Sequence, residues 1–346
     1  MNEMGKRSAR IYRPTPRNLA RLAAHLRSGE IVAVPTETVY GLAADAFDAR
    51  ACRRIFAAKG RPASDPLIVH IHAMRELEAV AEANPEARRL AKKFWPGPLT
   101  LILPKKRAVP DVVTAGRPSV AVRMPSHPVL RRLLKLTRRP IAAPSANPFG
   151  YVSPTTAEHV RHGLGMKIRH ILDGGPARIG LESTIVDLRD PESPVLLRPG
   201  AITRAALRRI LRVPVISGRK RVARAAQLAP GQLPRHYSPH TPIVLHRRID
   251  PRLAARGPAG EAWLFVARPE KLRGRRIHWL DAKGDLARAG RRLFAAIRKL
   301  DRAGYRRIHV EQAPGGGLAD AINDRLRRAA FSAPRARAHS ARRSPP

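Results

Sequence analysis

The chain has little of several features that define common classes of protein. Its single cysteine, Cys52, excludes a disulfide framework and is interpreted as a small core residue. No apolar run approaches the ~18 residues that a bilayer-spanning helix needs, and the N-terminal segment lacks the apolar region of a secretory signal. We therefore expect a cytoplasmic protein without a membrane partner.

Acidic residues are also scarce. The 346 residues include 26 Asp and Glu against 67 Lys and Arg, which gives a formal net charge of +41. Such a surface attracts polyanions without reading their sequence, so we expect weak, salt-dependent binding of tRNA or other polyanions. A GC-rich genome would also favour arginine codons, so composition alone can explain part of this charge without any function.

Aromatic residues make up only 4% of the chain, and no stripe of aromatics typical of an RNA-stacking surface is present. Several catalytic signatures are missing as well, namely Ser-His-Asp and Cys-His sets, zinc-ligand spacings and a Walker motif. The sequence therefore predicts neither covalent nucleophilic catalysis nor a resident metal site.

What the chain has instead is a set of predicted strand ends rich in hydroxyl groups. Residues 31–34 form an apolar, β-branched run that stops at Pro35, and Thr36, Glu37 and Thr38 follow it. Open α/β sheets usually bind ligands at such strand ends. Three further segments have the same character: A-P-S-A-N (143–147), S-P-T-T (153–156) and L-E-S-T-I-V-D (181–187). We interpret these loops as parts of one binding site.

Two cations follow the first of these loops in the sequence. Asp48 is a suitable cap for a helix that ends near Gly60, and Lys59 and Arg61 stand at its end. A strand is predicted next, over residues 67–71. Two cations on a loop constrained by Gly and Pro suit an anionic phosphate chain. In a chain this basic, Lys-Gly-Arg is more often a solvated turn, so the spacing alone leaves both interpretations open.

The chain resembles the YrdC/Sua5 family through six segments that occur in the family's order: P-T-E-T-V-Y-G-L-A, K-G-R-P-x-x-x-P-L-I-V-H-I, W-P-G-P-L-T, S-V-A-V-R-M-P, A-P-S-A-N and S-T-I-V-D. Members of this family are threonylcarbamoyl-AMP synthases, which serve the threonylcarbamoyladenosine modification of tRNA. The resemblance covers roughly residues 12–212. Further along, R-H-Y-S-P and A-I-N-D-R-L-R-R-A-A resemble the two-domain Sua5 form.

The resemblance implies an α/β fold class, with a YrdC-like twisted open mixed sheet and flanking helices, followed by a smaller C-terminal α/β domain of Rossmann-like type. We expect a flexible basic leader (1–11), a catalytic domain (12–212), a Pro- and Gly-rich linker (213–242), a C-terminal domain of about three strands (243–330) and a disordered basic tail (331–346). The linker resembles a lid that would exclude water from a labile acyl-adenylate.

The resemblance also implies the reaction. An L-threonylcarbamoyladenylate synthase makes threonylcarbamoyl-AMP and pyrophosphate from L-threonine, bicarbonate and ATP with Mg²⁺, and a downstream tRNA threonylcarbamoyl transferase is its expected partner. Threonine contacts are implied for Thr38, His70, Arg123, Ala143 and Ser183. ATP contacts are implied for Lys59, Arg61, Asp65, Ser119, Ser145, Asn147, Ser153, Arg198, His236 and Tyr237. Of these, Lys59, Arg61, Ser145 and Asn147 are the implied catalytic group.

Several of these positions have structural alternatives. Arg123 lies in an apolar strand and needs an anionic partner if it is buried, but it would also be tolerated facing solvent. A single histidine in an apolar strand, such as His70, is more often a core residue, and Ser153 is also suited to cap a helix. Asp65 stands where relatives often carry Asn. Since an acid repels phosphates, we expect Asp65 to turn outward or to bind Mg²⁺.

Two rival functions deserve comparison with the synthase. A non-catalytic RNA-binding or ribosome-maturation factor would use a basic surface, but the basic residues are spread along the chain instead of being concentrated. A carbamoyl-transfer enzyme of the hydrogenase-maturation type shares the YrdC-like domain. The absence of cysteine-rich zinc motifs and the Sua5-like C-terminal segment argue against it. The sequence favours the synthase.

Overall fold

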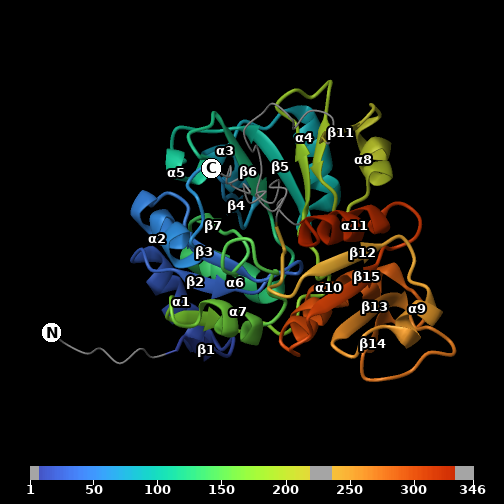
Figure 1. The fold of residues 1–346 in the computed structure, drawn as a ribbon. Coiled ribbons are helices and arrows are strands. Elements are labelled where there is room, and N and C mark those ends of the chain that lie inside the picture. Colours follow the sequence, from blue (N-terminus) through green and yellow to red (C-terminus); the bar gives the residue numbers. More distant parts are fainter. Residues whose placement is uncertain (1–7, 219–235, 332–346) are drawn as a thin grey trace, which may run out of the picture.

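The computed structural model describes residues 8–218 and 236–331, which form two α/β sheets with their helices (Figure 1). Most of the predicted linker, the start of the leader and most of the tail therefore lie outside the described residues. None of the helices within the described ranges combines the length and the apolarity that crossing a bilayer requires.

The first sheet is mixed and has eleven strands in the order β1-β8-β2-β3-β7-β4-β6-β5-β9-β10-β11. These strands are β1 (Arg10–Tyr12), β2 (Val32–Val34), β3 (Gly41–Asp45), β4 (Ile68–His70), β5 (Leu99–Pro104), β6 (Ser119–Arg123), β7 (Ile141–Ala142), β8 (His170–Leu172), β9 (Thr184–Asp187), β10 (Val195–Arg198) and β11 (Ile216–Ser217). The neighbouring strands β4 and β6 are parallel, and their register places His70 opposite Arg123. Both residues therefore lie at the same edge of the sheet, where parallel strands present ligand sites.

Helices cover both faces of this sheet. They are α1 (Pro16–Arg27), α2 (Ala49–Lys59), α3 (Leu77–Val80) with the short 3₁₀ turn η1 (Met74–Glu76), α4 (Pro85–Phe94), α5 (Asp111–Thr114), α6 (Pro128–Thr137), α7 (Ala157–Leu164) and α8 (Arg204–Leu211). On one face, α1 and α6 share an apolar core with β2, β3 and β7. On the other, α2, α4, α7 and α8 form a larger core that includes Cys52, as expected from the sequence.

The helix caps set the position of the predicted cations. The Asp48 side chain accepts hydrogen bonds from the backbone N–H groups of Arg50 and Ala51, and α2 therefore begins where the sequence predicts. Gly60 ends the helix with φ of 63°, in the left-handed region that glycine tolerates. Lys59 is consequently the last residue of α2, and its side chain reaches the loop after β7, where it contacts the Ser145 and Asn147 carbonyls.

The second sheet is smaller and entirely parallel. Its strands are β12 (Ile243–His246), β13 (Glu261–Ala267), β14 (Ile277–Asp281) and β15 (Arg307–Glu311), in the order β12-β15-β13-β14. Its helices are α9 (Pro251–Arg256), α10 (Leu286–Asp301) and α11 (Leu318–Ala329). In Figure 1, α10 and α11 lie on the side that faces the first domain. Val39, Val152 and Leu181 of the first domain join their apolar core, so the two domains share buried side chains.

The structure differs from the sequence-based expectation in three places. The end of the leader predicted over residues 1–11 is part of the sheet, because Arg10 and Ile11 belong to β1 and pair with β8. β11 falls inside the segment predicted as linker. The second sheet has four strands instead of about three, since the residues of β14, I-H-W-L-D, show no regular polar–apolar alternation that would predict a strand.

Candidate functional site

The P-T-E-T loop after β2 forms a tight turn built on a hydroxyl group. The Thr36 hydroxyl accepts hydrogen bonds from the backbone N–H groups of Thr38 and Val39, each at 3.1 Å, and donates to the Val39 carbonyl at 2.6 Å. The Thr36 and Thr38 hydroxyl oxygens are 2.8 Å apart. Because the Thr36 proton is already used, Thr38 is the donor in that pair, and its oxygen is fixed at the sheet edge.

Arg123 is the centre of the next group of contacts. Its side chain is buried, so the solvent-facing alternative is wrong, and its anionic partner is Glu37. The Arg123 Nη2 atom lies 2.8 Å from Glu37 Oε1, Nη1 donates to the Thr38 hydroxyl at 2.9 Å, and Nε donates to the Gly97 carbonyl at 3.2 Å. Burial alone would raise the pKa of Glu37, but Arg123 and the Ser126 N–H outweigh it and lower that pKa to about 2. The guanidinium is therefore held in one orientation by a charged carboxylate.

His70 lies beside Arg123 and is neutral. Burial, with the positive charge of Arg123, lowers its pKa to about 3. Its Nδ1 atom is 3.1 Å from the Ile68 carbonyl, which can only accept, so Nδ1 carries the proton. Nε2 is then a hydrogen-bond acceptor on a ring that lines the cavity. A ligand hydroxyl or ammonium group suits this nitrogen.

The depressed pKa of His70 predicts a loss of stability in acid. Below the ordinary value of 6.5 the unfolded chain takes up a proton at this position, whereas the folded chain does not until about 3. From pH 7 to pH 5, stability should therefore fall by about 2 kcal/mol on account of this residue. Urea unfolding at the two pH values measures the loss, and His70→Gln should reduce it. An equal pH dependence in the variant would contradict the assignment.

Ser183 is fixed by residues of two strands, β5 and β10. Its hydroxyl oxygen lies 2.7 Å from the Thr100 hydroxyl on β5 and accepts a hydrogen bond from Arg198 Nη2 at 3.0 Å. Arg198 Nε donates to the Ser183 carbonyl, also at 3.0 Å. The side chain of Arg198 is buried, and burial, together with other nearby cations, lowers its pKa. One arginine thus orients the hydroxyl and the backbone of the E-S-T loop.

Lys59 binds two backbone carbonyls of the A-P-S-A-N loop. Its Nζ atom donates to the carbonyls of Ser145, at 2.5 Å, and of Asn147. Burial, with the adjacent Arg61, lowers the pKa of this amine well below its ordinary value. Asn147 donates from Nδ2 to the carbonyls of Pro148 and Tyr151, each at 2.8 Å. Its Oδ1 atom is buried and has no hydrogen-bond partner among the described residues, as expected for an atom that awaits a ligand.

Asp65 is buried against Arg61, so the expectation that it turns outward is wrong. Its Oδ1 atom lies 2.9 Å from Arg61 Nη2, and neither side chain is more than 2% exposed. Arg61 also donates to the carbonyls of Asp65 and Pro66. Burial raises the pKa of Asp65, although the neighbouring cations act in the opposite direction. The Asp65 carboxylate neutralises part of the positive charge of Arg61, so less of that charge is available to a phosphate group.

His236 and Tyr237, from the start of the second described range, line the same cavity as Arg123 and His70. Tyr237 adopts φ of 62° and packs against Phe294 of α10, with ring centroids 5.4 Å apart. Burial lowers the pKa of His236 well below its ordinary value, and the charges of Arg61, Lys59 and Arg198 add to this effect. Both side chains line a cavity of only about 40 Å³, far below the ~300 Å³ of the smallest usual ligand pockets. In this conformation the cavity is therefore too small for a ligand of ordinary size.

The structure brings most of the predicted site residues together around that small cavity. Those that line it are Thr38, Arg61, His70, Arg123, Ala143, Ser145, Ser183, Arg198, His236 and Tyr237. Lys59, Asp65 and Asn147 do not line it. Lys59 donates to the carbonyls of Ser145 and Asn147, and Asp65 pairs with Arg61. Ser119 lies at the far end of β6 from Arg123, roughly 13 Å along the strand.

Ser153 and Glu182 form a contact that the sequence did not reveal. The Ser153 hydroxyl donates to Glu182 Oε1 at 2.5 Å, and the helix that follows is capped by Thr156, so the capping alternative for Ser153 is wrong. Glu182 and Glu37 are both buried acids paired with arginine, and neither is among the residues that the sequence predicts to contact a substrate. The signal was available: each acid directly precedes a hydroxyl residue of the predicted site.

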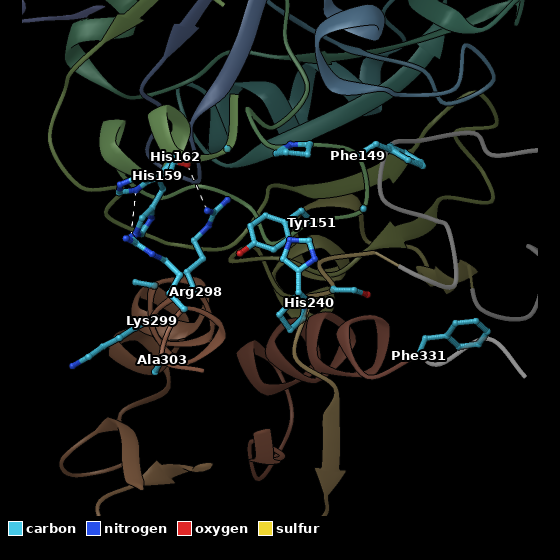
Figure 2. A pocket seen from close by; sticks show the side chains of 16 residues that line it. Phe149, Tyr151, His159, His162, His240, Arg298, Lys299, Ala303 and Phe331 are labelled. Carbon is cyan, nitrogen blue, oxygen red and sulfur yellow. Dashed lines mark hydrogen bonds between the residues drawn. The ribbon is translucent and has the colours of Figure 1, made fainter. Parts of the chain in front are cut away.

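A larger cavity of about 1260 Å³ lies beside the small one, at the junction of the two domains (Figure 2). Its walls continue the two site segments, with Phe149 and Tyr151 after Asn147 and His240 after Tyr237. Tyr151 and His240 stack in its centre, with ring centroids 5.0 Å apart. None of the predicted site residues lines this cavity, so the candidate chemistry lies in the smaller one.

A group of possible metal ligands lies away from the site. Glu30 joins His25 Nδ1, at 2.9 Å, to His170 Nε2, at 3.1 Å, at the edge of the first sheet. The two imidazole rings are stacked, 4.2 Å apart and 20° from parallel. Nearly parallel rings do not direct their nitrogen lone pairs to one point, so this geometry favours a hydrogen-bonded network. Among the described residues, it gives no support to a bound metal ion.

The chain is similar to known proteins over most of its length. Residues 24–200 match the Sua5–YciO–YrdC family, described as "Telomere recombination", and residues 202–331 match "Threonylcarbamoyl-AMP synthase, C-terminal domain". The chain is 43% identical to the threonylcarbamoyl-AMP synthase of Pyrococcus abyssi over 320 residues, which cover 89% of this chain and 92% of the relative. The synthase of Bacillus subtilis is 40% identical over 328 residues, with coverage of 90% and 92%. The solved structure of P. abyssi Sua5 complexed with L-threonine has a TM-score of 0.86 and 39% identity, and the match covers 93% of this chain and 98% of that one.

Proposed function

The chain belongs to the Sua5–YciO–YrdC family, and we propose that its buried cluster binds L-threonine at one end and ATP at the other. Membership confirms the family expected from the six sequence segments, and the second matched domain confirms the two-domain form. The activity is that of an L-threonylcarbamoyladenylate synthase, a nucleotidyltransferase that serves tRNA modification.

One observation carries the assignment of the site. A fixed guanidinium (Arg123), an acceptor nitrogen (His70) and two hydroxyls (Thr38 and Ser183) converge at the sheet edge, and a separate group of cations lies next to them. The first set matches the carboxylate, ammonium and hydroxyl groups of threonine. The second set, Lys59, Arg61 and Arg198, matches the charge of a triphosphate.

The reaction needs positioning more than covalent catalysis. The amine of threonine and bicarbonate form an N-carboxylate and release water. An oxygen of this carboxylate attacks the α-phosphorus of ATP, the bond from that phosphorus to the bridging oxygen breaks, and pyrophosphate leaves with the electron pair. Buried cations stabilise the charge that develops on the phosphates, because a water-excluded site strengthens such interactions.

Mg²⁺ fits the ATP end of the site. Asn147 Oδ1 is a buried oxygen without a partner among the described residues, and Ser145 lies two residues away on the same loop. Mg²⁺ prefers oxygen ligands and usually takes most of them from the phosphates and water. Bound there with ATP, the ion would neutralise phosphate charge. Asn147 and Ser145 would hold it, while Asp65 stays paired with Arg61.

Selection of threonine over valine follows from the same geometry. The hydroxyls of Thr38 and Ser183 and the His70 nitrogen form a polar pocket, and the methyl group that valine has in place of the threonine hydroxyl would offer no hydrogen to the His70 Nε2 acceptor. A buried acceptor left without its hydrogen bond costs more free energy than the packing of the extra methyl group contributes. The labile product is then suited for immediate transfer to tRNA by a downstream threonylcarbamoyl transferase, and the basic surface would bring weak affinity for tRNA.

Isotope-tracked product formation tests the function directly. Purified protein with ATP, L-threonine and labelled bicarbonate should release pyrophosphate and a labelled threonylcarbamoyl adenylate, and omission of threonine should abolish both. Valine in place of threonine serves as the matched control. If ATP stays intact while tRNA still binds, the assignment of the site fails, and a non-catalytic RNA-binding function takes its place.

Asp65→Asn is expected to strengthen ATP binding at the expense of stability. The carboxylate now pairs with Arg61 at 2.9 Å and competes with phosphate for it. The amide keeps the shape but removes the charge, so KM for ATP should fall severalfold, while the melting temperature without ATP should also fall because Arg61 is left as an unpaired buried charge. Steady-state kinetics and thermal unfolding with and without ATP measure the two effects. An unchanged KM for ATP would show that Arg61 does not contact the nucleotide.

A further inference from the structure

The second domain contacts the site through a buried arginine. Arg325 of α11 is 1% exposed, and its Nε atom lies 3.0 Å from Glu182 Oε2. Its Nη2 atom donates to the Glu182 carbonyl at 3.3 Å, and Nη1 donates to the Pro199 carbonyl at 2.6 Å. Glu182 directly precedes Ser183, and Pro199 directly follows Arg198. One side chain of the second domain therefore joins both segments that present these two site residues.

The same arginine also touches the segment that closes the site. Its guanidinium lies 5.6 Å from the centroid of the Tyr237 ring, at a distance suited to a cation–π contact. Glu182 in turn accepts the hydrogen bond from Ser153 at 2.5 Å. Arg325 thus lies at the point where three predicted site segments meet, although it does not itself line the cavity.

A second arginine of this domain acts in the same way on another loop. Arg298 of α10 donates to the carbonyls of Ser153, at 3.3 Å, and of Val152, and its guanidinium stacks on Tyr151 at 4.8 Å. Figure 2 shows Arg298 on the wall of the junction cavity, between α10 and the loop that carries Tyr151. Both arginines of the second domain bind backbone carbonyls of loops next to site residues.

Glycines allow the close approach that these contacts require. Gly180 has φ of 74°, and a Cβ atom there would lie 2.5 Å from the Arg291 backbone of α10. Gly290 of α10 meets the same loop, because its Cβ would lie 3.0 Å from Leu181. The loop that leads to Glu182 and Ser183 is therefore packed directly onto α10, with no room for a side chain between them.

We propose that Arg325 is a positioning residue for the synthase reaction: through Glu182 and Pro199 it fixes Ser183 and Arg198, so the second domain sets the geometry of the threonine and phosphate contacts. This inference rests on the proposed function. It gives the second domain a role in catalysis without placing any of its α11 residues in contact with substrate.

A planar guanidinium is needed for this role. Three of its nitrogens reach three different oxygens, on Glu182 and Pro199, at fixed mutual angles. A lysine ammonium can pair with the Glu182 carboxylate but cannot hold both segments in the same relative position. Replacing Arg325 with lysine therefore keeps the positive charge but loses the contacts that hold the two segments in position.

Steady-state kinetics of Arg325→Lys is the decisive experiment. The variant should melt close to the wild-type temperature, while KM for L-threonine and KM for ATP each rise about tenfold, since the charge stays buried and paired but the two segments lose their register. Arg325→Met combined with Glu182→Gln removes both charges. It should recover most of the melting temperature lost in Arg325→Met alone, yet keep the raised KM values. Arg292→Ala is the matched control, because Arg292 of α10 is exposed and its one hydrogen bond among the described residues, to the Leu280 carbonyl, stays within the second domain.

The outcomes separate this inference from the proposed function. Wild-type KM values in Arg325→Lys, or full recovery of both KM values and melting temperature in the double variant, would overturn the positioning role and leave Arg325 as a structural residue. Raised KM values with the control unchanged support it. A wild-type protein that releases no pyrophosphate with threonine would instead contradict the proposed function itself.

Discussion

Replacing Arg123 with alanine is expected to abolish measurable use of threonine, lowering kcat/KM for L-threonine by roughly a hundredfold or more. At the threonine end of the site, Glu37, Thr38 and Gly97 together fix the orientation of the Arg123 guanidinium. Its Nη atoms retain N–H groups for a carboxylate, and alanine removes them. Binding of ATP should change much less, because the triphosphate cations lie elsewhere.

Stability should fall in the same variant. Glu37 is buried and its pKa is lowered to about 2 largely by Arg123, so alanine leaves an uncompensated carboxylate. Breaking a buried ion pair in this way costs about 3–5 kcal/mol. Urea unfolding measures this cost, and calorimetric titration with L-threonine measures binding.

Two further variants separate binding from stability. Arg89→Ala removes an arginine from an exposed pair with Glu86 at 2.9 Å, and it should change stability by less than about 1 kcal/mol. Arg123→Met combined with Glu37→Gln removes both buried charges and should restore much of the stability but none of the threonine binding. Retention of threonine affinity in Arg123→Ala would disprove the carboxylate contact.

The sequence predicted the local elements of the site well, because each rests on short-range rules. The Asp48 cap and the Gly60 terminator of α2 follow from backbone hydrogen bonding, and they place Lys59 correctly. The β-branched strands that carry His70 and Arg123 follow from residue type. The family resemblance then supplied the relation between these elements, and the large mixed sheet and the second domain are as it implied.

The parts that the sequence did not reveal depend on contacts between distant segments. β3 reads Gly-Leu-Ala-Ala-Asp, in which every residue except Leu is of a type with low strand propensity, and it forms because β2 and β7 pair with it on either side. The partners of the buried acids are equally remote: Arg123 for Glu37 and Arg325 for Glu182. The apolar strand around Arg123 suggests burial but does not identify Glu37 as its partner, and nothing in local composition distinguishes Arg325 from the many exposed arginines in a chain of charge +41.

Lys59→Met is expected to have the complementary effect and to abolish use of ATP while threonine still binds. The methionine side chain fills a similar volume but cannot donate to the carbonyls of Ser145 and Asn147, and it offers no charge to phosphate. We expect kcat/KM for ATP to fall roughly a hundredfold or more, with threonine affinity near that of the wild type. Kinetics with varied ATP measure kcat/KM for ATP, and calorimetry with threonine measures the affinity for threonine. The exposed Lys93 of α4, replaced by Met, is the control and should leave both unchanged.

The pH dependence of ATP use gives an independent test of the same residue. Because burial lowers the pKa of Lys59, the free enzyme loses this charge at a lower pH than an ordinary lysine would. Raising the pH should therefore reduce kcat/KM for ATP, which reports the free enzyme, before it reduces kcat, which reports the bound complex. Bound phosphates favour the charged amine and shift its pKa upward, so saturating ATP should restore the rate. In Lys59→Met this difference between the two profiles should disappear. If the variant keeps it, another group titrates, and Lys59 serves only to hold the A-P-S-A-N loop.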